Sequence, residues 1–360
     1  MPAPENVSGY LHIAATYSID LTIVGPEAPL VAGVVDVFQR ASRKIIGPTR
    51  AAARLEASKL FAKKFFARAG IPTARARESW NEFAFPVVIK ADGLAAGKGV
   101  VIAQNRIEAE RAIEQLGPHV VIEEFLEGEE VSFIALSNGE MILPFAPTQD
   151  HKRIFDGDRG PNTGGMGAYC DPRILTSQES GDIMERIMLP AIRQMRKEGN
   201  PFTGFLYAGL MMTTEGPKVL EFNVRLGDPE TQALMHNFRG DFAEVLTLTE
   251  AGPETVYPQS WADCSLCVVL AAQGYPERPR VGDLITGIAE AEAAGAIAFH
   301  AGTVKRNGEL LTNGGRVLGV TSGGETLQEA INNAYKAVGK IHFDGMQYRK
   351  DIGQKGLRRW

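Results

Sequence analysis

The stretch from Phe85 to Ala103, FPVVIKADGLAAGKGVVIA, constrains the fold of this 360-residue chain more than any other. Two β-branched runs, 87–89 and 100–102, flank a glycine-containing turn, a pattern typical of a β-hairpin. Glycine lets such a turn adopt positive φ and bring backbone N–H groups close to an anion. With Lys90 and Lys98 as positive charges, we interpret the hairpin as a clasp over nucleotide phosphates. An ordinary glycine-rich surface hairpin is the alternative.

Two common phosphate-binding loops are excluded by spacing. A Walker A loop has four residues between its glycines and then Gly-Lys-Ser/Thr opening a helix. Here Gly93 and Gly97 enclose only three residues, and a strand pattern follows. A Rossmann loop needs a third glycine after G-x-G, but Gly97-Lys98-Gly99 is followed by Val-Val-Ile.

Composition and charge exclude several classes of protein. A length of 360 residues predicts two or three domains at about 150 residues each. The net charge of −5 is not gathered into runs, which argues against a nucleic-acid partner. Apolar runs are too short for a membrane span, and the amino terminus does not resemble a signal peptide. Cys170, Cys264 and Cys267 are interpreted as core residues of a cytoplasmic protein.

The first part of the chain predicts α/β structure. We expect a helix at 9–17, a strand at 21–24, a helix reaching Arg40 and a strand at 44–46. Two short parallel strands cannot bury their own faces, so a neighbouring element or preceding sequence is expected beside them. A further helix is predicted from Thr49, as N-cap, to Ala69. Its lysines, 59 and 63, would by default lie on a solvated face.

An acidic segment follows the next predicted elements, a helix at 106–116 and a strand beginning at Val120. Residues 123–130 hold five acidic side chains. They could form a solvated edge. Alternatively, an extended hinge here would offer backbone groups to adenine and one carboxylate to the ribose hydroxyls.

Residues 148–169, TQDHKRIFDGDRGPNTGGMGAY, form a long polar segment with five glycines. Structureless loops beyond about 12–15 residues are usually functional or disordered. Because this segment combines charges of both signs with neutral hydrogen-bonding groups, we favour a substrate loop over a disordered linker.

A second hairpin is predicted at 204–212 and 218–225, after a helix at 177–197 that Pro190 should kink. Alternate strand residues share a face, so Glu221, Asn223 and Arg225 should point one way. Leu220, Phe222 and Val224 should then point into the core. Carboxylate and amide oxygens on one face suit Mg²⁺, and the arginine could hold a phosphoryl or carboxylate group. An exposed polar strand face is the alternative.

A third unit is predicted from about residue 253. It has strands near 265–272, 297–300 and 316–321 and a helix from Thr326 to about Val338. No charged constellation in it suggests chemistry.

Together these motifs resemble the ATP-grasp superfamily and, within it, the phosphoribosylamine–glycine ligase (glycinamide ribonucleotide synthetase) family of purine biosynthesis. Matching segments run in order from about residue 6 to 353. They are IDLTIVGPEAPLVAGVVD at 19–36, VVIKADGLAAGKGVVIA at 87–103, VIEEFLEGEEVSF at 121–133, QDHKR at 149–153, GPNTGGMGAY at 160–169, TGFLYAGLM at 203–211, KVLEFNVRLGDPETQ at 218–232, HAGT at 300–303 and TNGGRVLGVT at 312–321.

The resemblance implies an α/β (α+β) ATP-grasp fold. The ATP-grasp domain would span 48–252, with a cap subdomain at about 73–124, between an amino-terminal α/β domain at 1–47 and a small carboxy-terminal α+β domain at 253–360. It also implies an ATP-dependent carbon–nitrogen ligase that joins glycine to 5-phosphoribosylamine. ATP would phosphorylate the glycine carboxylate, and the ribosylamine nitrogen would attack the acyl phosphate. A monomer is expected, without nucleic acid or membrane as partner.

Residue roles follow from the same resemblance. Lys90 would contact ATP phosphates with help from Lys59, and Arg225 would steady the transferring group or substrate. The other implied roles are phosphate closure by Gly97, Lys98 and Gly99; the adenine hinge at Glu123, Glu124, Phe125 and Leu126; ribose binding by Glu130; Mg²⁺ or Mn²⁺ binding by Glu221 and Asn223; and substrate binding by Asp150, His151, Lys152, Asn162 and Thr163 with Arg225.

Two departures from the family pattern generate further expectations. Family members carry a strand and a glycine-rich loop before the part that matches Ile19, so the amino-terminal domain is predicted to be a truncated remnant. The segment 73–85 is short and is expected to lack a helix of the cap. The alternatives are an ATP-binding remnant with impaired or no ligase turnover and an ATP-grasp enzyme acting on another carboxylate.

Overall fold

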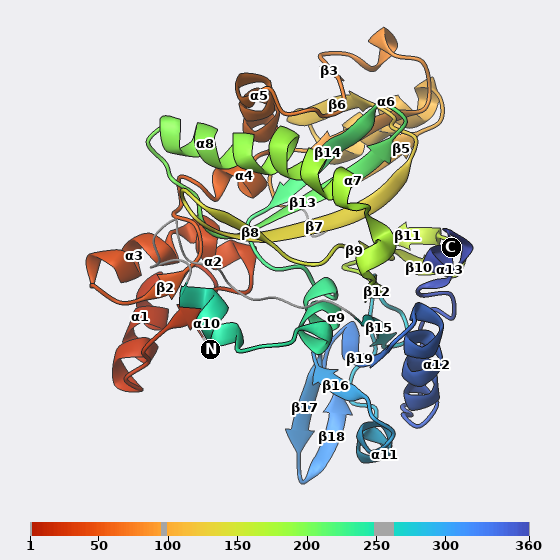
Figure 1. The fold of residues 1–360 in the computed structure, drawn as a ribbon. Coiled ribbons are helices and arrows are strands. Elements are labelled where there is room, and N and C mark those ends of the chain that lie inside the picture. Colours follow the sequence, from red (N-terminus) through yellow and green to blue (C-terminus); the bar gives the residue numbers. More distant parts are fainter. Residues whose placement is uncertain (1, 95–98, 248–262, 360) are drawn as a thin grey trace. The chain divides into compact units, whose positions relative to one another are not determined.

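The computed structural model describes residues 2–94, 99–247 and 263–359, which form two compact units. Within these limits the first unit holds residues 2–145, 176–226 and 241–247, and the second holds 146–175, 227–240 and 263–359. Both mix helices and strands (Figure 1). The predicted boundaries at 47/48 and 252/253 stay a prediction, because these units group residues by contacts and not by their order in the chain.

The amino-terminal part of the first unit has the predicted alternation of helices and strands. It consists of α1 (Val7–Thr16), β1 (Thr22–Ile23), α2 (Glu27–Ala32), α3 (Val34–Arg40) and β2 (Ile45–Ile46). The two strands pair in parallel. The single helix expected before Arg40 is divided at Gly33, whose φ of 91° lies in the left-handed region that glycine favours.

The predicted helix from Thr49 to Ala69 is two helices, α4 (Arg54–Ala57) and α5 (Lys59–Ala69). Ser58 separates them with an extended backbone, and its hydroxyl accepts a hydrogen bond from the Phe61 N–H at 3.1 Å. Ser58 therefore caps α5, and the expectation that Thr49 caps one long helix was wrong. The predicted end at Gly70 is confirmed, since this glycine adopts a φ of 66°.

A four-stranded antiparallel sheet contains the opening hairpin. Its strands, in the order β3 (Ala76–Arg77), β6 (Val120–Glu124), β4 (Val87–Ala91) and β5 (Val100–Ala103), are covered by α6 (Arg106–Leu116) (Figure 1). The hairpin prediction is confirmed, with Val87 opposite Ala103 and Lys90 opposite Val100. In the segment expected to lack a cap helix, the structure has one short 3₁₀ turn, Trp80–Glu82.

A second antiparallel sheet in this unit holds β14 (Gly216–Asn223), β13 (Thr203–Thr213), β7 (Glu129–Asn138) and β8 (Ile142–Pro144) in that order. A bulge at Leu220 interrupts the β13–β14 pairing, since Gly209 faces Glu221 while Leu210 faces Val219. The alternation therefore shifts, and Val219 is buried with Phe222 and Val224. The prediction that Leu220 points into the core is confirmed in part: it is only partly buried at the bulge, but it packs against the buried Ala74, Leu126 and Met211.

The helical segment 177–197 consists of α7 (Ser177–Ile183), a π-helical turn (Met184–Met188) and α8 (Leu189–Lys197), while α10 (Phe242–Leu246) lies further along the chain. Pro190 lies in the first turn of α8. Because proline has no N–H to donate, the regular α-helical ladder is interrupted there, and the wider π turn precedes it. At the place where Pro190 was predicted to kink the helix, the structure has this π turn.

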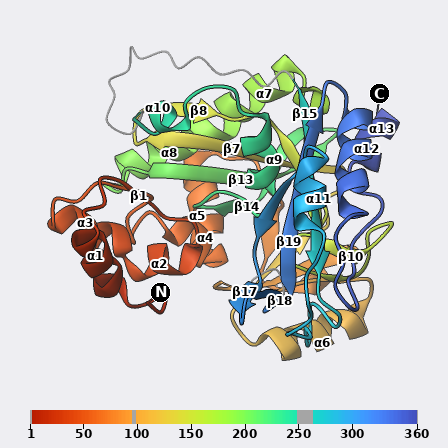
Figure 2. The same cartoon turned by 90° about the horizontal axis from the view of Figure 1, so that it is seen from below.

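The second unit is built on five antiparallel strands. Their order is β9 (Thr148–Asp150), β12 (Gly167–Cys170), β15 (Cys264–Ala271), β19 (Arg316–Gly324) and β16 (Ile297–His300). The helices α9 (Glu230–Asn237) and α12 (Leu327–Val338) pack on β15 and β19 (Figure 2). The other elements are β17 (Thr303–Arg306), β18 (Glu309–Thr312), α11 (Ile288–Ala293), α13 (Gln354–Arg359) and a 3₁₀ turn at Pro172–Ile174. The strands and helix predicted here are confirmed.

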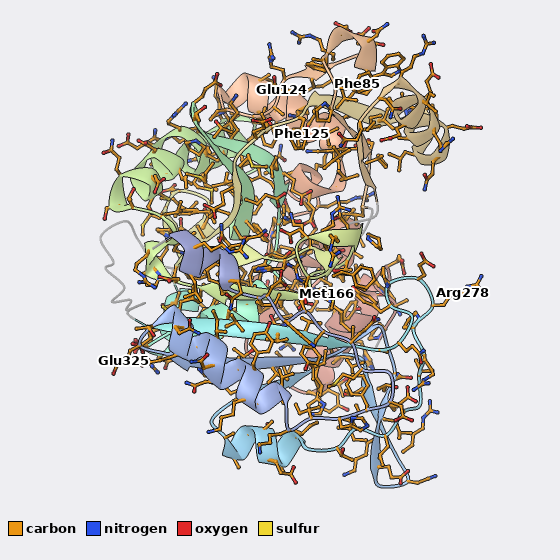
Figure 3. All side chains as sticks on the ribbon, turned by 90° about the vertical axis from the view of Figure 1, so that its right-hand side faces the viewer. Phe85, Glu124, Phe125, Met166, Arg278 and Glu325 are labelled. Atoms are coloured by element: carbon orange, nitrogen blue, oxygen red, sulfur yellow. The ribbon has the colours of Figure 1, made fainter. Side chains whose placement is uncertain are left out.

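The polar segment 148–169 is not the loop that its composition predicts. It contributes β9 and β12 to the five strands and forms a hairpin of β10 (Arg153–Phe155) and β11 (Arg159–Asn162). Met166, within the segment, is fully buried against Ile154 and Ala271 (Figure 3). Polar residues form strands here because the ladder satisfies their backbone groups and both faces of β12 are covered.

The three cysteines are buried and carry free thiols, as predicted for core residues. Burial raises the pKa of the Cys170 and Cys267 thiols to about 12. No helix in the described ranges combines the length and hydropathy needed to cross a membrane.

Candidate nucleotide and metal site

Lys90 and Glu123 form a buried ion pair between neighbouring strands of the first unit. The register of β4 and β6 places Val88 opposite Glu123, two residues before Lys90. The Lys90 Nζ lies 2.8 Å from the Glu123 Oε2 and also donates to the Leu220 carbonyl at 2.9 Å. Lys90 is 6% exposed and Glu123 is 2% exposed. An ammonium has three donors, so one N–H of Lys90 has no acceptor among the described residues.

Two lysines of α5 approach the same region. The Lys63 Nζ lies 2.7 Å from the other oxygen of Glu123, Oε1. Lys59, one turn earlier, donates to the Gly93 carbonyl at 2.8 Å. Burial lowers the pKa of both α5 ammonium groups, and the carboxylates of Glu123 and Glu221 oppose that effect at Lys63 and Lys59 respectively. The unit therefore gathers positive charge next to the glycine-containing turn.

Glu221 and Asn223 share a half-buried face near the end of β14. Opposite Glu221 lies Gly209, which has no side chain, and a Cβ there would lie 3.5 Å from the Glu221 Cγ. In the described part of the chain, neither the Glu221 carboxylate nor the Asn223 amide has a hydrogen-bond partner. The side-chain oxygens of Glu221 and Asn223 are on one face and could both bind a cation, which is consistent with the predicted cation site.

Arg225 lies between two acidic side chains of the first unit. Its Nε is 3.3 Å from the Glu27 Oε2, and its Nη2 is 3.7 Å from the Glu56 Oε1. The other oxygen of Glu56 accepts the Val224 N–H at 2.8 Å. Glu56 therefore contacts both the Val224 N–H and the Arg225 guanidinium, the two residues that follow Asn223 in the chain.

Burial raises the pKa of Glu56 to about 7, while Arg225 and the Val224 N–H favour the charged form. The folded state therefore binds this proton more tightly than the unfolded state, where the carboxyl has its ordinary pKa of 4.5. The contribution of this proton to the free energy of unfolding is fully present below the pKa of Glu56 in the unfolded chain. It is lost as the pH rises toward the folded-state pKa of about 7.

We expect Glu56→Gln to flatten this pH dependence. The measurement is the urea midpoint at about pH 5 and about pH 8, compared with Glu114→Gln, which changes an exposed carboxylate on α6. If the urea midpoint fell by the same amount between the two pH values in the Glu56 and Glu114 variants, the raised pKa of Glu56 would be contradicted.

The predicted adenine hinge is only partly an exposed acidic edge. Glu123 is buried in the ion pairs above, and Leu126 is also buried. Glu124 instead binds the cap segment, since its Oε2 accepts from the Arg75 Nε at 2.6 Å and its Oε1 accepts the Arg75 N–H at 2.9 Å. Phe125 is 37% exposed and lies beside Glu124 (Figure 3). Residues 125–127 lie between β6 and β7, and Glu130 is exposed on β7.

The predicted substrate residues of the polar segment belong to the second unit. Thr163 is buried, and its N–H and hydroxyl both donate to the Lys152 carbonyl, at 2.8 and 2.9 Å. His151 is 1% exposed, and its ring nitrogens have no hydrogen-bond partner among the residues that the structure describes. Burial lowers its pKa to about 3. Asp150 and Asn162 are half-buried. Their assignment to substrate stays a prediction.

Two residues of the predicted phosphate closure, Gly97 and Lys98, lie outside the described residues. Gly99 lies within them, and its carbonyl accepts the Ala91 N–H at 2.8 Å. The contact closes the base of the hairpin.

Sequence reasoning missed three contributors to this arrangement: Lys63, Glu56 and Glu27. A detectable signal existed for Lys63 alone, because it follows Lys59 by one helical turn and so shares its face. Glu27 and Glu56 meet Arg225 through sequence separations of 198 and 169 residues, for which a single sequence gives no signal.

This geometry, with the buried Lys90–Glu123 ion pair on a glycine-containing hairpin and two half-buried lysines of α5 nearby, together with the Glu221–Asn223 strand face, is the arrangement of the ATP-grasp class. Domain models of phosphoribosylglycinamide synthetase match nearly the whole chain: the N domain at residues 2–56, the ATP-grasp (A) domain at 57–231 and the C domain at 265–355. The chain therefore belongs to the phosphoribosylglycinamide synthetase family.

Relatives in this family are similar over almost the full length of the chain. Proteins named phosphoribosylamine–glycine ligase from Ralstonia nicotianae and Escherichia coli are 49% and 48% identical over 99% of this chain, which covers 88% and 90% of theirs. The crystal structure of phosphoribosylamine–glycine ligase from Thermotoga maritima aligns with a TM-score of 0.78 at 39% identity, covering 86% of this chain and 82% of that one. Biotin carboxylase from Campylobacter jejuni, 14% identical with a TM-score of 0.72, shares the fold alone.

The comparisons do not bear out the prediction of a truncated amino-terminal domain, since the N-domain model matches residues 2–56. They also lend no support to the alternative of an ATP-binding remnant without turnover, because the named relatives are ligases.

Proposed function

We propose that this chain uses ATP to join glycine to 5-phosphoribosylamine, giving glycinamide ribonucleotide, ADP and phosphate in purine biosynthesis. The observation that carries the proposal is the buried Lys90 ammonium. It pairs with Glu123, donates to the carbonyl of Leu220, the residue before Glu221, and keeps one donor without an acceptor in the described ranges. The names of the relatives, at 47–49% identity over 99% of the chain, support this choice of substrates.

A divalent cation fits the residues of this face. Glu221 offers a carboxylate and Asn223 an amide oxygen, and neither has a hydrogen-bond partner in the described ranges. Hard cations such as Mg²⁺ or Mn²⁺ prefer oxygen ligands and often keep phosphate oxygens in their coordination shell. When bound, such a cation would neutralise phosphate charge and orient the transferring group.

The side chains of the first unit would then serve ATP and the reacting carboxylate. Lys90 and Lys59 would donate to phosphate oxygens, and the hairpin turn would exclude water from them. The residues at the 123–126 hinge and Glu130 would receive adenine and ribose. Arg225, held by Glu27 and Glu56, would bind the glycine carboxylate or the phosphoryl group bidentately. Asp150, His151, Lys152, Asn162 and Thr163 remain our proposed substrate residues.

Two bond exchanges account for the reaction. A glycine carboxylate oxygen attacks the γ-phosphorus, and the bond to the ADP oxygen breaks. The ribosylamine nitrogen then attacks the carbonyl carbon, loses a proton, and the carbon–oxygen bond to phosphate breaks. The released phosphate therefore retains one oxygen atom from glycine.

Isotope transfer tests this route directly. With glycine labelled with ¹⁸O in its carboxylate, we expect one labelled oxygen in each phosphate released, together with glycinamide ribonucleotide in the same molar amount. Mass spectrometry of both products is the measurement, and reactions without 5-phosphoribosylamine are the control. Unlabelled phosphate would exclude the acyl phosphate, while ATP binding without any product would contradict the ligase function.

We further propose that the protein acts as a monomer in the cytoplasm. The distributed net charge and the buried, unoxidised cysteines support this. Light scattering of the purified protein checks the oligomeric state.

A further inference from the structure

The side chain of Lys63 has every donor engaged within the protein. Its Nζ donates to the Thr73 hydroxyl at 2.7 Å and to the Ala74 carbonyl at 2.8 Å, and it pairs with the Glu123 Oε1 at 2.7 Å. Three acceptors match the three N–H donors of an ammonium. The contrast with Lys90, which keeps one donor without an acceptor in the described ranges, separates the two lysines by role.

These contacts also join three separate segments of the first unit. Lys63 lies in α5, Thr73 and Ala74 lie in the connection that leads to β3, and Glu123 lies in β6. Thr73 in turn donates its hydroxyl to the Val219 carbonyl at 2.7 Å, one residue before the bulge. Lys63 therefore fixes β6 and the entry to the four-stranded sheet against α5 and β14.

The charges lead to the same distinction. Glu123 receives one ammonium on each oxygen, from Lys63 at Oε1 and from Lys90 at Oε2. The buried group of three thus carries an excess of one positive charge, which suits an anionic ligand. Without Lys63, Glu123 would neutralise Lys90 and draw it into a closed pair.

We propose that Lys63 is a positioning residue for nucleotide binding. It occupies one oxygen of Glu123, and this leaves the Lys90 ammonium with a donor and a net charge for a nucleoside di- or triphosphate. This inference rests on the proposed ATP-dependent function, and it assigns Lys63 no contact with the nucleotide.

The test is the affinity of Lys63→Met for ADP, measured by calorimetry in the intact protein. We expect binding to weaken roughly 10–100-fold, by analogy with the loss found when a residue that orients a metal-binding side chain is removed. The KM for ATP should rise accordingly, while the KM for glycine stays unchanged. Lys64→Met is the matched control, because Lys64 is the next residue of α5 and is exposed. Unchanged ADP affinity in folded Lys63→Met would overturn the proposal.

A double-mutant cycle with Glu123→Gln separates positioning from a merely structural role. If Lys63 acts through Glu123, Lys63→Met will weaken ADP binding less in the Glu123→Gln background than in the unmodified protein, because the carboxylate that would neutralise Lys90 is absent there. If Lys63→Met weakened ADP binding by the same factor with and without Glu123→Gln, the proposal would be overturned. Should Lys63→Met fail to fold, Lys63→Gln, which keeps an amide donor without the charge, carries the same expectation and the same contradiction.

Wild-type measurements distinguish failure of this inference from failure of the proposed function. Absence of ADP binding and of glycine-dependent ADP release in the unmodified protein would contradict the ligase function. Normal wild-type binding and turnover with an unaffected Lys63→Met would contradict only the role of Lys63.

Discussion

Lys90→Met is expected to lower kcat/KM for ATP by about 10³-fold, with ADP binding too weak to measure by calorimetry. The substitution removes a buried ammonium with one donor that has no acceptor among the described residues, and of the two ion pairs of Glu123 it leaves the one with Lys63. Because methionine fills a similar volume, the four-stranded sheet should still form, and circular dichroism should match that of the unmodified protein.

The matched control for this variant is Lys218→Met. Lys218 is also a strand lysine in an ion pair, 2.6 Å from the Glu215 Oε2, but it lies near the outer turn of the β13–β14 hairpin. We expect that control to change kcat/KM less than about twofold, since exposed ion pairs contribute little. Equal losses in the two variants would refute the assignment of Lys90 to phosphate.

Glu221→Gln is expected to have the second large effect, a loss of about 10³-fold in turnover at low magnesium concentration. The amide keeps the shape of the side chain and the contact over Gly209 but removes the charge that a cation needs. Raising the magnesium or manganese concentration should restore part of the rate, because the weakened site can still be filled by mass action. Initial rates across a range of metal concentrations provide the measurement.

Glu215→Gln, in the turn of the same hairpin, is the control for Glu221. Its half-saturating magnesium concentration should equal that of the unmodified protein. Retention of both activity and the same metal dependence by Glu221→Gln would show that the cation binds elsewhere.

Local patterns predicted the elements that carry this site. The runs 87–89 and 100–102 pair as expected, α6 spans Arg106–Leu116 as predicted, and Glu221 and Asn223 share a face. Such features depend on interactions between near neighbours in the chain, namely strand alternation, glycine turns and helix caps, which a single sequence records directly.

Other features depended on distant partners. The polar composition of 148–169 predicted a loop, but pairing with β15 makes 167–170 a strand. Leu220 was expected in the core with Phe222 and Val224, but a bulge against β13 leaves Leu220 only partly buried and buries Val219 fully. A ladder is formed between segments far apart in sequence, so its register and its bulges cannot be read from one of its strands.

The sequence by itself determined the hairpin at Phe85–Ala103, the acidic run after Val120 and the residue types along β14, because each lies within a few neighbouring positions. Only the tertiary structure decided which charges are paired. Lys63 and Lys90 meet Glu123 from two other elements, and Glu56 and Glu27 flank Arg225. Folding brings these groups together and removes them from water, and that burial turns ordinary surface residue types into a charged site.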